Sequence, residues 1–425
     1  MHALRALRHR NFRLYFCGQG ISLIGTWMTR LATSWLVYRL THSSLLLGVV
    51  TFAGQIPTFL AAPIAGVWVD RWNRRRVLLV TQFLAAVQSL MLAGLTLSGR
   101  ITIWEIVALS IFQGLINAFD MPGRQSFLVQ MVNGRADLSN AIALNSTMVN
   151  GARLLGPALA GITIAAVGEG WCFLIDGVSY FAVLASIYAM RVSSQNAAGA
   201  EGDLMEKLRE GWNYVTRFPP IRTILILFSI VSLMGIPYTV LMPEFATEIL
   251  HGGPHTLGFL MGAVGIGAVG SAVTLAVRKS VRGLYWMLPV VAGVFGAGLI
   301  AFSFSREFWL SVALMVITGF GMMQVLSVSN TLIQTIVEED KRGRVMSYWT
   351  MAYMGASPFG SLLAGGMSPV IGTPATVALC GVGCIAGAIW FRLQIPKLIP
   401  IIRPIYQRLG IVPLPVAPVA IDGEN

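Results

Sequence analysis

A few ionisable side chains stand inside long apolar stretches of the chain, where such groups can hold an ion or carry a proton. Asp120 and Arg124 are four residues apart, so on a helix they share a face and can pair. Arg30, Arg153 and Asp176 lie within other apolar stretches. A charge in apolar surroundings is costly and indicates function, and a carboxylate beside a cation can take up and release a proton.

We therefore take Asp120 and Asp176 as candidate proton carriers, with Arg30, Arg124 and Arg153 as their cationic partners. From their positions along their apolar stretches, Arg30 and Asp176 are expected to pair. For Asp120 and Arg124 a structural alternative stays open, in which their pair locks an inner gate and carries no proton.

The elements that must position these groups are membrane helices. Of the 425 residues, 55% are hydrophobic and 11% charged, whereas soluble domains carry about 25% charged residues. The stretches 44–69, 77–97 and 283–305 contain no charge, and each exceeds the roughly 18 residues typical of a transmembrane helix. A soluble enzyme and a fibrous or disordered chain are excluded, and an all-α membrane protein is predicted.

Breaks in the apolar pattern predict twelve spans in two six-helix bundles. The expected spans are 12–39, 44–69, 76–98, 102–132, 138–167, 171–191, 221–247, 256–278, 283–304, 307–337, 342–371 and 374–393. The domains predicted from them are an N-terminal bundle (1–192), a linker with a short amphipathic helix (193–220), a C-terminal bundle (221–393) and a cytoplasmic tail (394–425).

The positive charges indicate the orientation. The net charge is +12, and all but five of the 30 Lys and Arg residues fall on one side of the predicted bilayer. The positive-inside rule places that side, with both termini, in the cytoplasm, which requires an even number of spans. The basic clusters are then topology signals facing the lipid bilayer, and no nucleic-acid partner is expected. The five exceptions are Arg39, Arg100 and Arg306 at the other side and Arg30 and Arg153 within spans.

No enzyme chemistry is indicated. His251 and His255 share one outer loop, and no Ser–His set or metal-ligand spacing is present. We expect no catalytic residue, no metal and no cofactor. The cysteines lie in or beside apolar runs and are expected to be packing residues: Cys17, Cys172, Cys380 and Cys384.

The two halves carry an internal repeat. An ungapped offset of 204 residues aligns nine glycines of 48–180 with nine glycines of 252–384, where about two coincidences are expected by chance. A tandem six-helix duplication is one of the main plans of membrane transporters. Glycine recurs because small residues let helix backbones approach closely in lipid.

The stretch Gly66-Val-Trp-Val-Asp70-Arg71-Trp-Asn-Arg74-Arg75 matches the pattern G-x-x-x-D-R-x-x-R-R. It resembles the loop 2–3 signature of the major facilitator superfamily, with an asparagine where the family usually has its second glycine. Gly66 is expected to permit close helix packing, and Asp70 to face a helix N-terminus of the opposite half. The arginines would neutralise the carboxylate and pin the loop.

Gly156, Pro157 and Gly161 form a second motif, in the predicted fifth span. Their G-P-x-x-[AG]-G core is similar to the signature of the exporter branches of this superfamily. Pro157 removes a backbone donor and is expected to kink the helix near the domain interface. A simple packing kink is the alternative.

The whole chain from about residue 4 to 391 resembles the bacterial subfamily of the enterobactin exporter and macrolide-type efflux pumps, through GTWMTRLATSWLVYRLTHSS, NAFDMPGRQSFLVQMV, NAIALNSTMVNGARLLGPALAG and RGRVMSYWTMAYMGASPFGSLLAG. The resemblance implies a monomeric exporter in the bacterial cytoplasmic membrane, with substrate passing between spans 1, 4, 7 and 10. The expected cavity residues suit a large amphipathic cargo and are Trp27, Gln113, Asn117, Met234, Tyr238 and Gln324.

The function expected is export of siderophores or amphipathic drugs by alternating access, coupled to protons. A lipid or lysolipid flippase on the same fold would also suit apolar cavity walls. A transport-inactive sensor or scaffold is the alternative from another class of protein.

Overall fold

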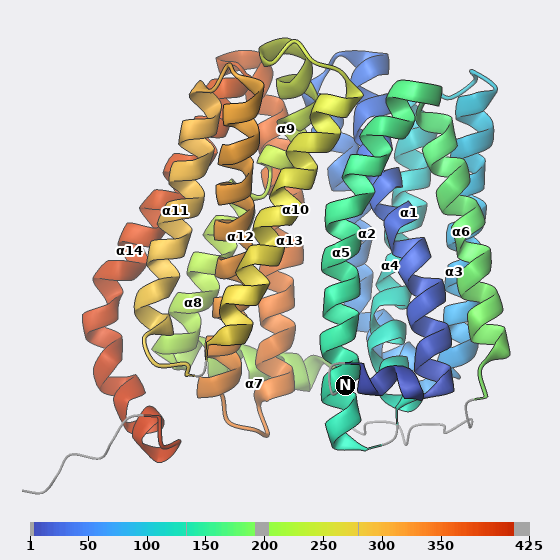
Figure 1. Ribbon diagram of the computed structural model, residues 1–425. Coiled ribbons are helices and arrows are strands. Elements are labelled where there is room, and N and C mark those ends of the chain that lie inside the picture. Colours follow the sequence, from blue (N-terminus) through green and yellow to red (C-terminus); the bar gives the residue numbers. More distant parts are fainter. Residues whose placement is uncertain (1–3, 133, 192–203, 279, 412–425) are drawn as a thin grey trace, which may run out of the picture.

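The computed structural model describes residues 4–132, 134–191, 204–278 and 280–411, and these residues form helices without any strand. The helices stand side by side in two groups (Figure 1). The first group comprises η1 (Arg5–Arg8), α1 (Arg10–Thr41), α2 (Ser44–Arg71), α3 (Arg74–Leu97), α4 (Ile103–Leu128), η2 (Val129–Met131), α5 (Arg135–Val167) and α6 (Glu169–Ala189). The second comprises α7 (Leu204–Arg217), α8 (Pro219–Ile230), η3 (Val231–Gly235), α9 (Tyr238–Glu244), η4 (Phe245–Ile249), α10 (Pro254–Val277), α11 (Leu284–Phe304), α12 (Phe308–Ile336), α13 (Arg342–Ile371) and α14 (Thr373–Arg408).

Ten helical segments within the described residues are long and apolar enough to cross a membrane, which confirms a multi-pass, all-helical membrane protein. Two further helices, α1 and α13, have comparable length but are more polar. Both contact the other half of the molecule, since α1 packs against α9 and α13 against α2. Their polar residues are therefore compatible with a place near the centre rather than against lipid.

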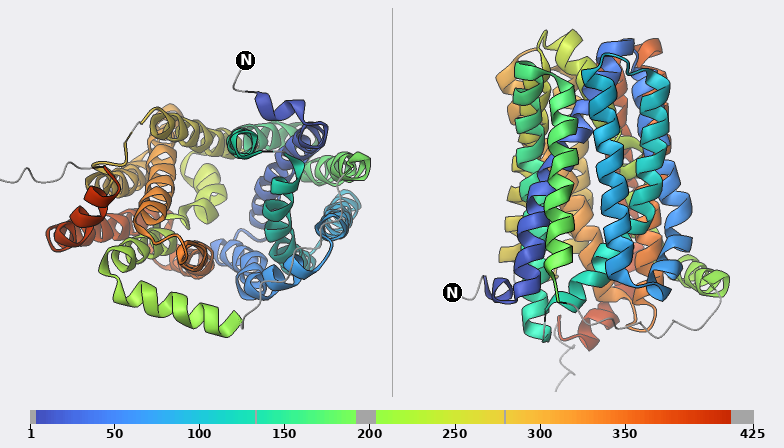
Figure 2. Two further views of the ribbon diagram at one scale, coloured as in Figure 1. Left: turned by 90° about the horizontal axis from the view of Figure 1, so that it is seen from below. Right: turned by 90° about the vertical axis from the view of Figure 1, so that its right-hand side faces the viewer.

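Both ends of the described chain lie at one face of the bundle, together with α7 (Figure 1). We call this the terminal face and the opposite one the far face. At the terminal face η1 is docked onto the start of α5, because the Ala6 N–H donates to Asn140 Oδ1 over 2.9 Å. Arg5 and His9 both contact the carboxylate of Asp137. The short helix α7 lies across the same face, at the periphery of the other helices of the second group (Figure 2).

The seventh predicted span, 221–247, is not one regular helix. It is interrupted by the π-helical turns η3 and η4, where the Ile236 N–H donates to Val231 O over 3.3 Å and the Leu250 N–H to Phe245 O over 3.1 Å. Pro237 and Pro243 fall in this region, and a proline lacks the N–H that a regular helix needs. The segment Pro219–Ile249 is still one apolar, membrane-crossing stretch, in agreement with the predicted span. Apolar periodicity does not register the breaks within it.

The last helix ends at Arg408, well past the expected end at residue 393. Pro396, Pro400 and Pro404 lie within this extension. Ile395, Leu398 and Ile402 on the same extension are buried, so packing outweighs the local cost of the prolines. The start of the expected tail is thus helical.

The two groups meet along two seams related by the internal repeat, α5 against α10 and α2 against α13. We call them the glycine seams. A Cβ built on Gly258 would lie 2.8 Å from the Cα of Gly161 and from the Pro157 carbonyl oxygen. A Cβ built on Gly365 would lie 2.5 Å from the Ser44 carbonyl oxygen and 3.1 Å from the Cα of Gly48. All these glycines lie toward the far face, where only glycine allows the helices to approach this closely.

The packing loosens toward the terminal face. No atom of the described structure lies within 4 Å of a Cβ built on Gly66, near the end of α2, or on Gly343, at the start of α13. The expectation that Gly66 permits a close helix contact is therefore wrong in this conformation. The two halves are held at the far face, where the Tyr38 hydroxyl also donates to Glu248 Oε1 over 3.0 Å.

Candidate functional site

Two cations share one aromatic ring near the middle of the molecule. The guanidinium carbon of Arg30 on α1 lies 4.8 Å from the ring centroid of Trp27. That of Arg153 on α5 lies 5.2 Å from the same centroid, so the two cations are at most about 10 Å apart. Arg30 is midway along its helix and yet exposed. It therefore faces accessible space inside the bundle and not a packed core.

The helix backbones determine where this cluster sits. A Cβ built on Gly156 would lie 2.4 Å from Trp27 Cβ and 3.0 Å from the Ile24 carbonyl oxygen. The exporter-like motif thus has two structural tasks. Gly156 brings α5 against α1 at the tryptophan, and Gly161 brings α5 against α10 of the other half. Pro157 lies within α5, which remains one helix from end to end.

Residues of the second half reach the same place. Arg153 Nη1 lies 3.7 Å from the Sδ of Met323 on α12. Tyr238 on α9 interacts electrostatically with Arg153, and Tyr353 on α13 interacts with Arg30. Met323 and Tyr353 were missed from the sequence, although Tyr353 lies in the aromatic stretch of α13 that carries the family resemblance.

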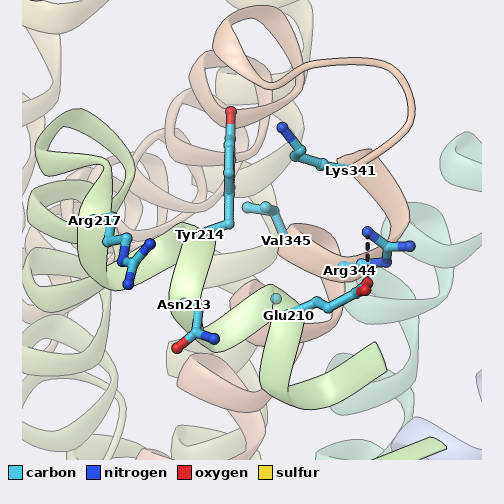
Figure 3. Close-up of a pocket in the computed structure, with 8 residues that line it drawn as sticks. Glu210, Asn213, Tyr214, Arg217, Lys341, Arg344 and Val345 are labelled. Carbon is cyan, nitrogen blue, oxygen red and sulfur yellow. Dashed lines mark ion pairs between the residues drawn. The ribbon is translucent and has the colours of Figure 1, made fainter. Parts of the chain in front are cut away.

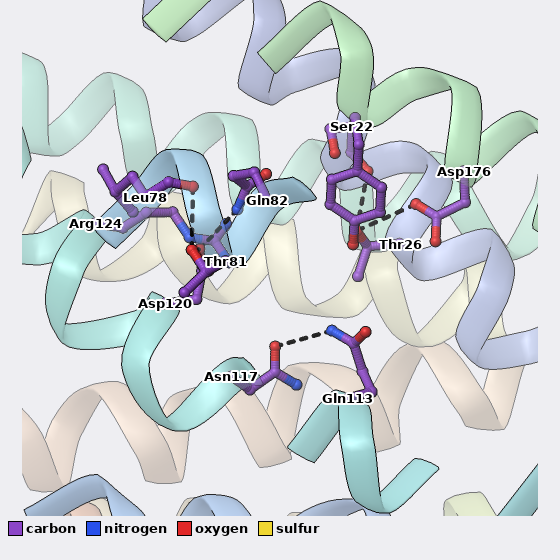
Figure 4. Close-up of polar contacts among 11 residues, drawn as sticks. Ser22, Thr26, Leu78, Thr81, Gln82, Gln113, Asn117, Asp120, Arg124 and Asp176 are labelled. Carbon is purple, nitrogen blue, oxygen red and sulfur yellow. Dashed lines mark hydrogen bonds and ion pairs between the residues drawn. The ribbon is translucent and has the colours of Figure 1, made fainter. Parts of the chain in front are cut away.

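Asp120 and Arg124 form the ion pair that their spacing predicts (Figure 4). Asp120 Oδ1 also accepts hydrogen bonds from Thr81 Oγ1 at 3.0 Å and Gln82 Nε2 at 2.7 Å. All four residues belong to α3 and α4, and the carboxylate is buried. The ion pair lies within α4, and the hydrogen bonds to Asp120 join α4 to α3 of the same half. In this conformation the pair does not form a lock between the halves.

Asp176 lies in a separate buried network between α1, α3 and α6 (Figure 4). It accepts hydrogen bonds from Ser89 Oγ at 3.0 Å and Thr26 Oγ1 at 3.5 Å. A Cβ built on Gly25 would lie 2.8 Å from Asp176 Oδ1. The expected ion pair with Arg30 is not formed, because hydroxyl groups hold the carboxylate and the arginine turns to Trp27 instead.

The expected cavity residues divide into two groups. Trp27, Gln113 and Asn117 are partly exposed, and Gln113 Nε2 donates to Asn117 Oδ1 over 3.2 Å (Figure 4). Tyr238 and Gln324 are fully buried and do not line open space in this conformation. Gln324 turns toward α10, where its Nε2 donates to Thr274 Oγ1 over 2.5 Å. The expectation failed there because position on a helix does not reveal which neighbour a side chain faces.

Met234, the sixth of these residues, is partly exposed and packs against α14. Its side chain would lie 2.8 Å from a Cβ built on Gly383.

The loop 2–3 motif lies at the terminal face. The side chain of Asp70 is outside the described residues, so its expected contact with the opposite half stays a prediction. Asn73 Oδ1 accepts from the Arg76 N–H over 3.2 Å and caps the start of α3. Arg75 Nη2 donates to the Tyr188 carbonyl oxygen at the end of α6 over 2.8 Å. This hydrogen bond ties the loop to the end of α6.

A pocket of about 380 Å³ lies between α7 and the turn before α13 (Figure 3). Glu210 and Arg344 form an ion pair of 2.9 Å across it. Lys341 lies 4.8 Å from the ring centroid of Tyr214, and its hydrogen bond to Glu338 raises the pKa of its amine. Burial raises the pKa of the Tyr214 hydroxyl. These contacts fasten α7 to the second half.

Among the described residues no group of His, Cys, Asp and Glu is arranged to hold a metal ion. Cys172, Cys380 and Cys384 are buried, as expected of packing residues. Cys17 is exposed, which corrects the expectation for this residue.

Replacement of Gly156 by alanine should displace Trp27. The added methyl would overlap Trp27 Cβ and crowd a backbone oxygen of α1, so we expect a loss of about 1–3 kcal/mol in stability. Gly94→Ala is the matched control, because no atom of the described structure lies within 4 Å of its added Cβ. Denaturant titration in detergent measures both. Equal midpoints for the two variants would contradict the packing described.

Two matched helical halves around a polar centre define the class of the protein: it is a polytopic membrane transporter. The family model described as transmembrane secretion effector matches residues 1–400. The chain belongs to this family, within the major facilitator superfamily.

Curated relatives match over most of their length. The chain is 24% identical over 382 residues to the staphyloferrin A transporter of Staphylococcus aureus, covering 89% of this chain and 95% of the relative. It is 27% identical over 367 residues to the multidrug efflux pump Tap of Mycolicibacterium fortuitum, covering 83% and 88%. It is 23% identical over 395 residues to the enterobactin exporter EntS of Citrobacter koseri, covering 92% and 93%.

Solved structures share the fold at low sequence identity. A POT family transporter in complex with 5-aminolevulinic acid superposes with a TM-score of 0.74 at 11% identity, covering 92% of this chain and 96% of that one. A bacterial homologue of the human lysosomal transporter Spinster, in an inward-facing and unoccupied conformation, gives 0.64 at 13% identity, covering 98% and 99%.

Proposed function

We propose that the protein exports a small amphipathic molecule from the bacterial cytoplasm by alternating access, driven by the proton gradient. The observation that carries this proposal is the uneven packing of the two halves. The glycine seams are tight toward the far face, whereas Gly66 and Gly343, toward the terminal face on the paired helices α2 and α13, have open surroundings. Rocking one half against the other would close the terminal face and open the far one.

In this proposal the chain spans the membrane twelve times. The twelve spans are the ten apolar segments together with α1 and α13, whose lengths of 32 and 30 residues suffice to cross a bilayer. The terminal face is cytoplasmic because the basic clusters lie there, as in the loop 71–76. The conformation described is then open to the cytoplasm, where an exporter takes up its cargo.

The cargo class follows from the relatives and from the centre of the molecule. The relatives include a staphyloferrin A transporter, an enterobactin exporter and a multidrug efflux pump. In this chain an aromatic ring, a methionine and amide groups surround the middle of the bundle, as Trp27, Met323 and Gln113 do. Such a lining suits a siderophore or an amphipathic drug.

Asp176 is the better of the two proposed proton sites. Asp120 is bound in an ion pair with Arg124, and removing its charge would leave a cation without its partner. Asp176 is held by hydroxyl groups alone among the described residues, and it interacts electrostatically with Arg30 of the central cluster. Protonation there would change the field at the place where cargo is proposed to bind.

The test is transport into inverted membrane vesicles, with a panel of siderophores, dyes and a lysophospholipid. We expect uptake of at least one siderophore or dye that stops when the pH gradient is collapsed, and loss of that dependence in Asp176→Asn. Asp340→Asn, at an exposed turn, is the matched control.

Uptake of the lysophospholipid alone would favour a flippase, and no uptake of any compound would favour a sensor or scaffold. If coupling is unchanged in both Asp120→Asn and Asp176→Asn, neither carboxylate carries the coupled proton.

A further inference from the structure

The two central cations have no acidic partner among the described residues. Arg30 and Arg153 form no ion pair there, and Arg153 Nε is buried without a hydrogen-bond partner. The two guanidinium groups repel each other across Trp27. A pair of like charges at the middle of a membrane protein is costly unless something neutralises it.

Nearby carboxylates do not fill this role. Asp120 is engaged by Arg124, Thr81 and Gln82 on its own side of the first half. Asp176 interacts electrostatically with Arg30, but it is held by Ser89 and Thr26 and forms no ion pair with the arginine. The centre therefore keeps an excess of positive charge.

The opposite half supplies neutral donors. The hydroxyl of Tyr238 is fully buried, has no hydrogen-bond partner within the described structure and interacts electrostatically with Arg153. Tyr353 is partly exposed and interacts electrostatically with Arg30. Hydroxyl and guanidinium groups both donate to an anion, and charge-assisted hydrogen bonds of this kind are the strong ones.

We infer that the site formed by Trp27, Arg30 and Arg153 binds an organic anion that carries an aromatic or other apolar body, and that the buried Tyr238 hydroxyl joins the site when the halves close. This inference rests on the proposed export function and narrows its cargo. The anionic group lies between the two arginines, and the apolar body lies against Trp27 and Met323. A cationic molecule of the same shape is rejected, because it would add a third positive charge to the cluster.

The site also joins the two halves when it is occupied. Arg30 and Arg153 belong to the first half, whereas Tyr238 and Met323 belong to the second. An anion that draws donors from both would favour closure of the halves around it. Empty, the cluster holds two repelling cations in accessible space, and this favours the open conformation described.

The test uses three probes with the same ring system and different charge: 1-naphthoate, 1-naphthylmethanol and 1-naphthylmethylamine. Their binding to the purified full-length protein in detergent is measured by calorimetry at neutral pH. We expect the anion to bind at least about tenfold more tightly than the cation, equivalent to about 1.4 kcal/mol. Arg30→Gln and Arg153→Gln should each abolish this preference. Arg30→Lys should restore most of it, and Arg100→Gln, at an exposed turn, should leave it unchanged.

Equal affinity for the three probes, or an anion preference that survives both glutamine variants, would overturn the inference. A thermal unfolding scan of each variant separates loss of the site from loss of the fold. Lyso-phosphatidylglycerol tests whether the anion is a lipid headgroup. Its competition with naphthoate at the arginines would assign the site to a lipid, and its failure would assign the site to a soluble organic anion.

The binding assay is independent of transport, so the two proposals fail separately. Arginine-dependent binding of naphthoate without any gradient-dependent uptake in vesicles would overturn the export function and leave the anion site. Uptake of cargo without any preference for anions would overturn the anion site and leave the export function.

Discussion

Gly258→Ala should open the far face and strongly slow transport. The new methyl would lie 2.8 Å from two backbone atoms of α5, the Gly161 Cα and the Pro157 carbonyl oxygen. Ordinary contacts are about 3.5–4.0 Å, so the helices must separate where the inward-open state requires them to touch. The equilibrium should shift toward the outward-open state, and turnover should fall by at least about tenfold, equivalent to 1.4 kcal/mol.

Spin labels can follow this shift. Cysteines at Ser98 and Glu307 report on the far face, in a background where the exposed Cys17 is replaced by serine. We expect their separation to increase in Gly258→Ala and to stay unchanged in the control Gly293→Ala, whose added Cβ meets no atom within 4 Å in the described structure. Wild-type distances and turnover in Gly258→Ala would contradict the role of the glycine seams.

Asp120→Leu should be strongly destabilising. The carboxylate is 2% exposed and binds Arg124, Thr81 and Gln82. Removing one partner of a buried ion pair costs about 3–5 kcal/mol, and we expect about 2–4 kcal/mol here because the Arg124 side chain keeps 27% of its exposure.

The double variant Asp120→Leu/Arg124→Met should recover at least half of this loss, because it leaves no unpaired charge. Glu339→Leu, an exposed carboxylate near the turn before α13, is the control and should change stability little. Denaturant titration in detergent measures the four proteins. A double variant no more stable than the single one would show that the ion pair is not what Asp120 contributes.

The glycine seams and the buried charges are distributed differently between the two halves. The glycine seams lie between the two halves, and in the proposed mechanism they are the contacts about which the halves move. The buried charges belong to the first half, and Asp120 stabilises α3 against α4. The same half therefore supplies a rigid charge network and, at Arg30 and Arg153, a pair of cations free to meet a ligand.

Part of this arrangement could be predicted from the sequence. Long apolar runs located nearly all of the helices, and the spacing of Asp120 and Arg124 predicted their pair. The coincident glycines predicted two related halves, and the structure uses several of them where the halves touch. Local patterns succeed here because helix periodicity and close packing depend on neighbouring residues.

Other features depend on which helices become neighbours. The pair expected between Arg30 and Asp176 is replaced by two separate sets of contacts, with Trp27 and with hydroxyl groups. Gln324 turns to α10 and Tyr238 is buried, although both lie in helices expected to line the centre. The π-helical turns of the seventh span depend on prolines whose effect is conformational. None of these follows from depth in the membrane or from residue type.

The central claim is that an anionic cargo leaves in exchange for protons. Its most direct test is the proton movement that cargo itself causes in proteoliposomes whose terminal face is outward and whose lumen is acidic and holds a pH-sensitive dye. Adding a transported organic anion outside should raise the lumenal pH as protons leave, in wild type and not in Arg153→Gln or Asp176→Asn. Entry of the anion with an unchanged or falling lumenal pH would contradict the exchange.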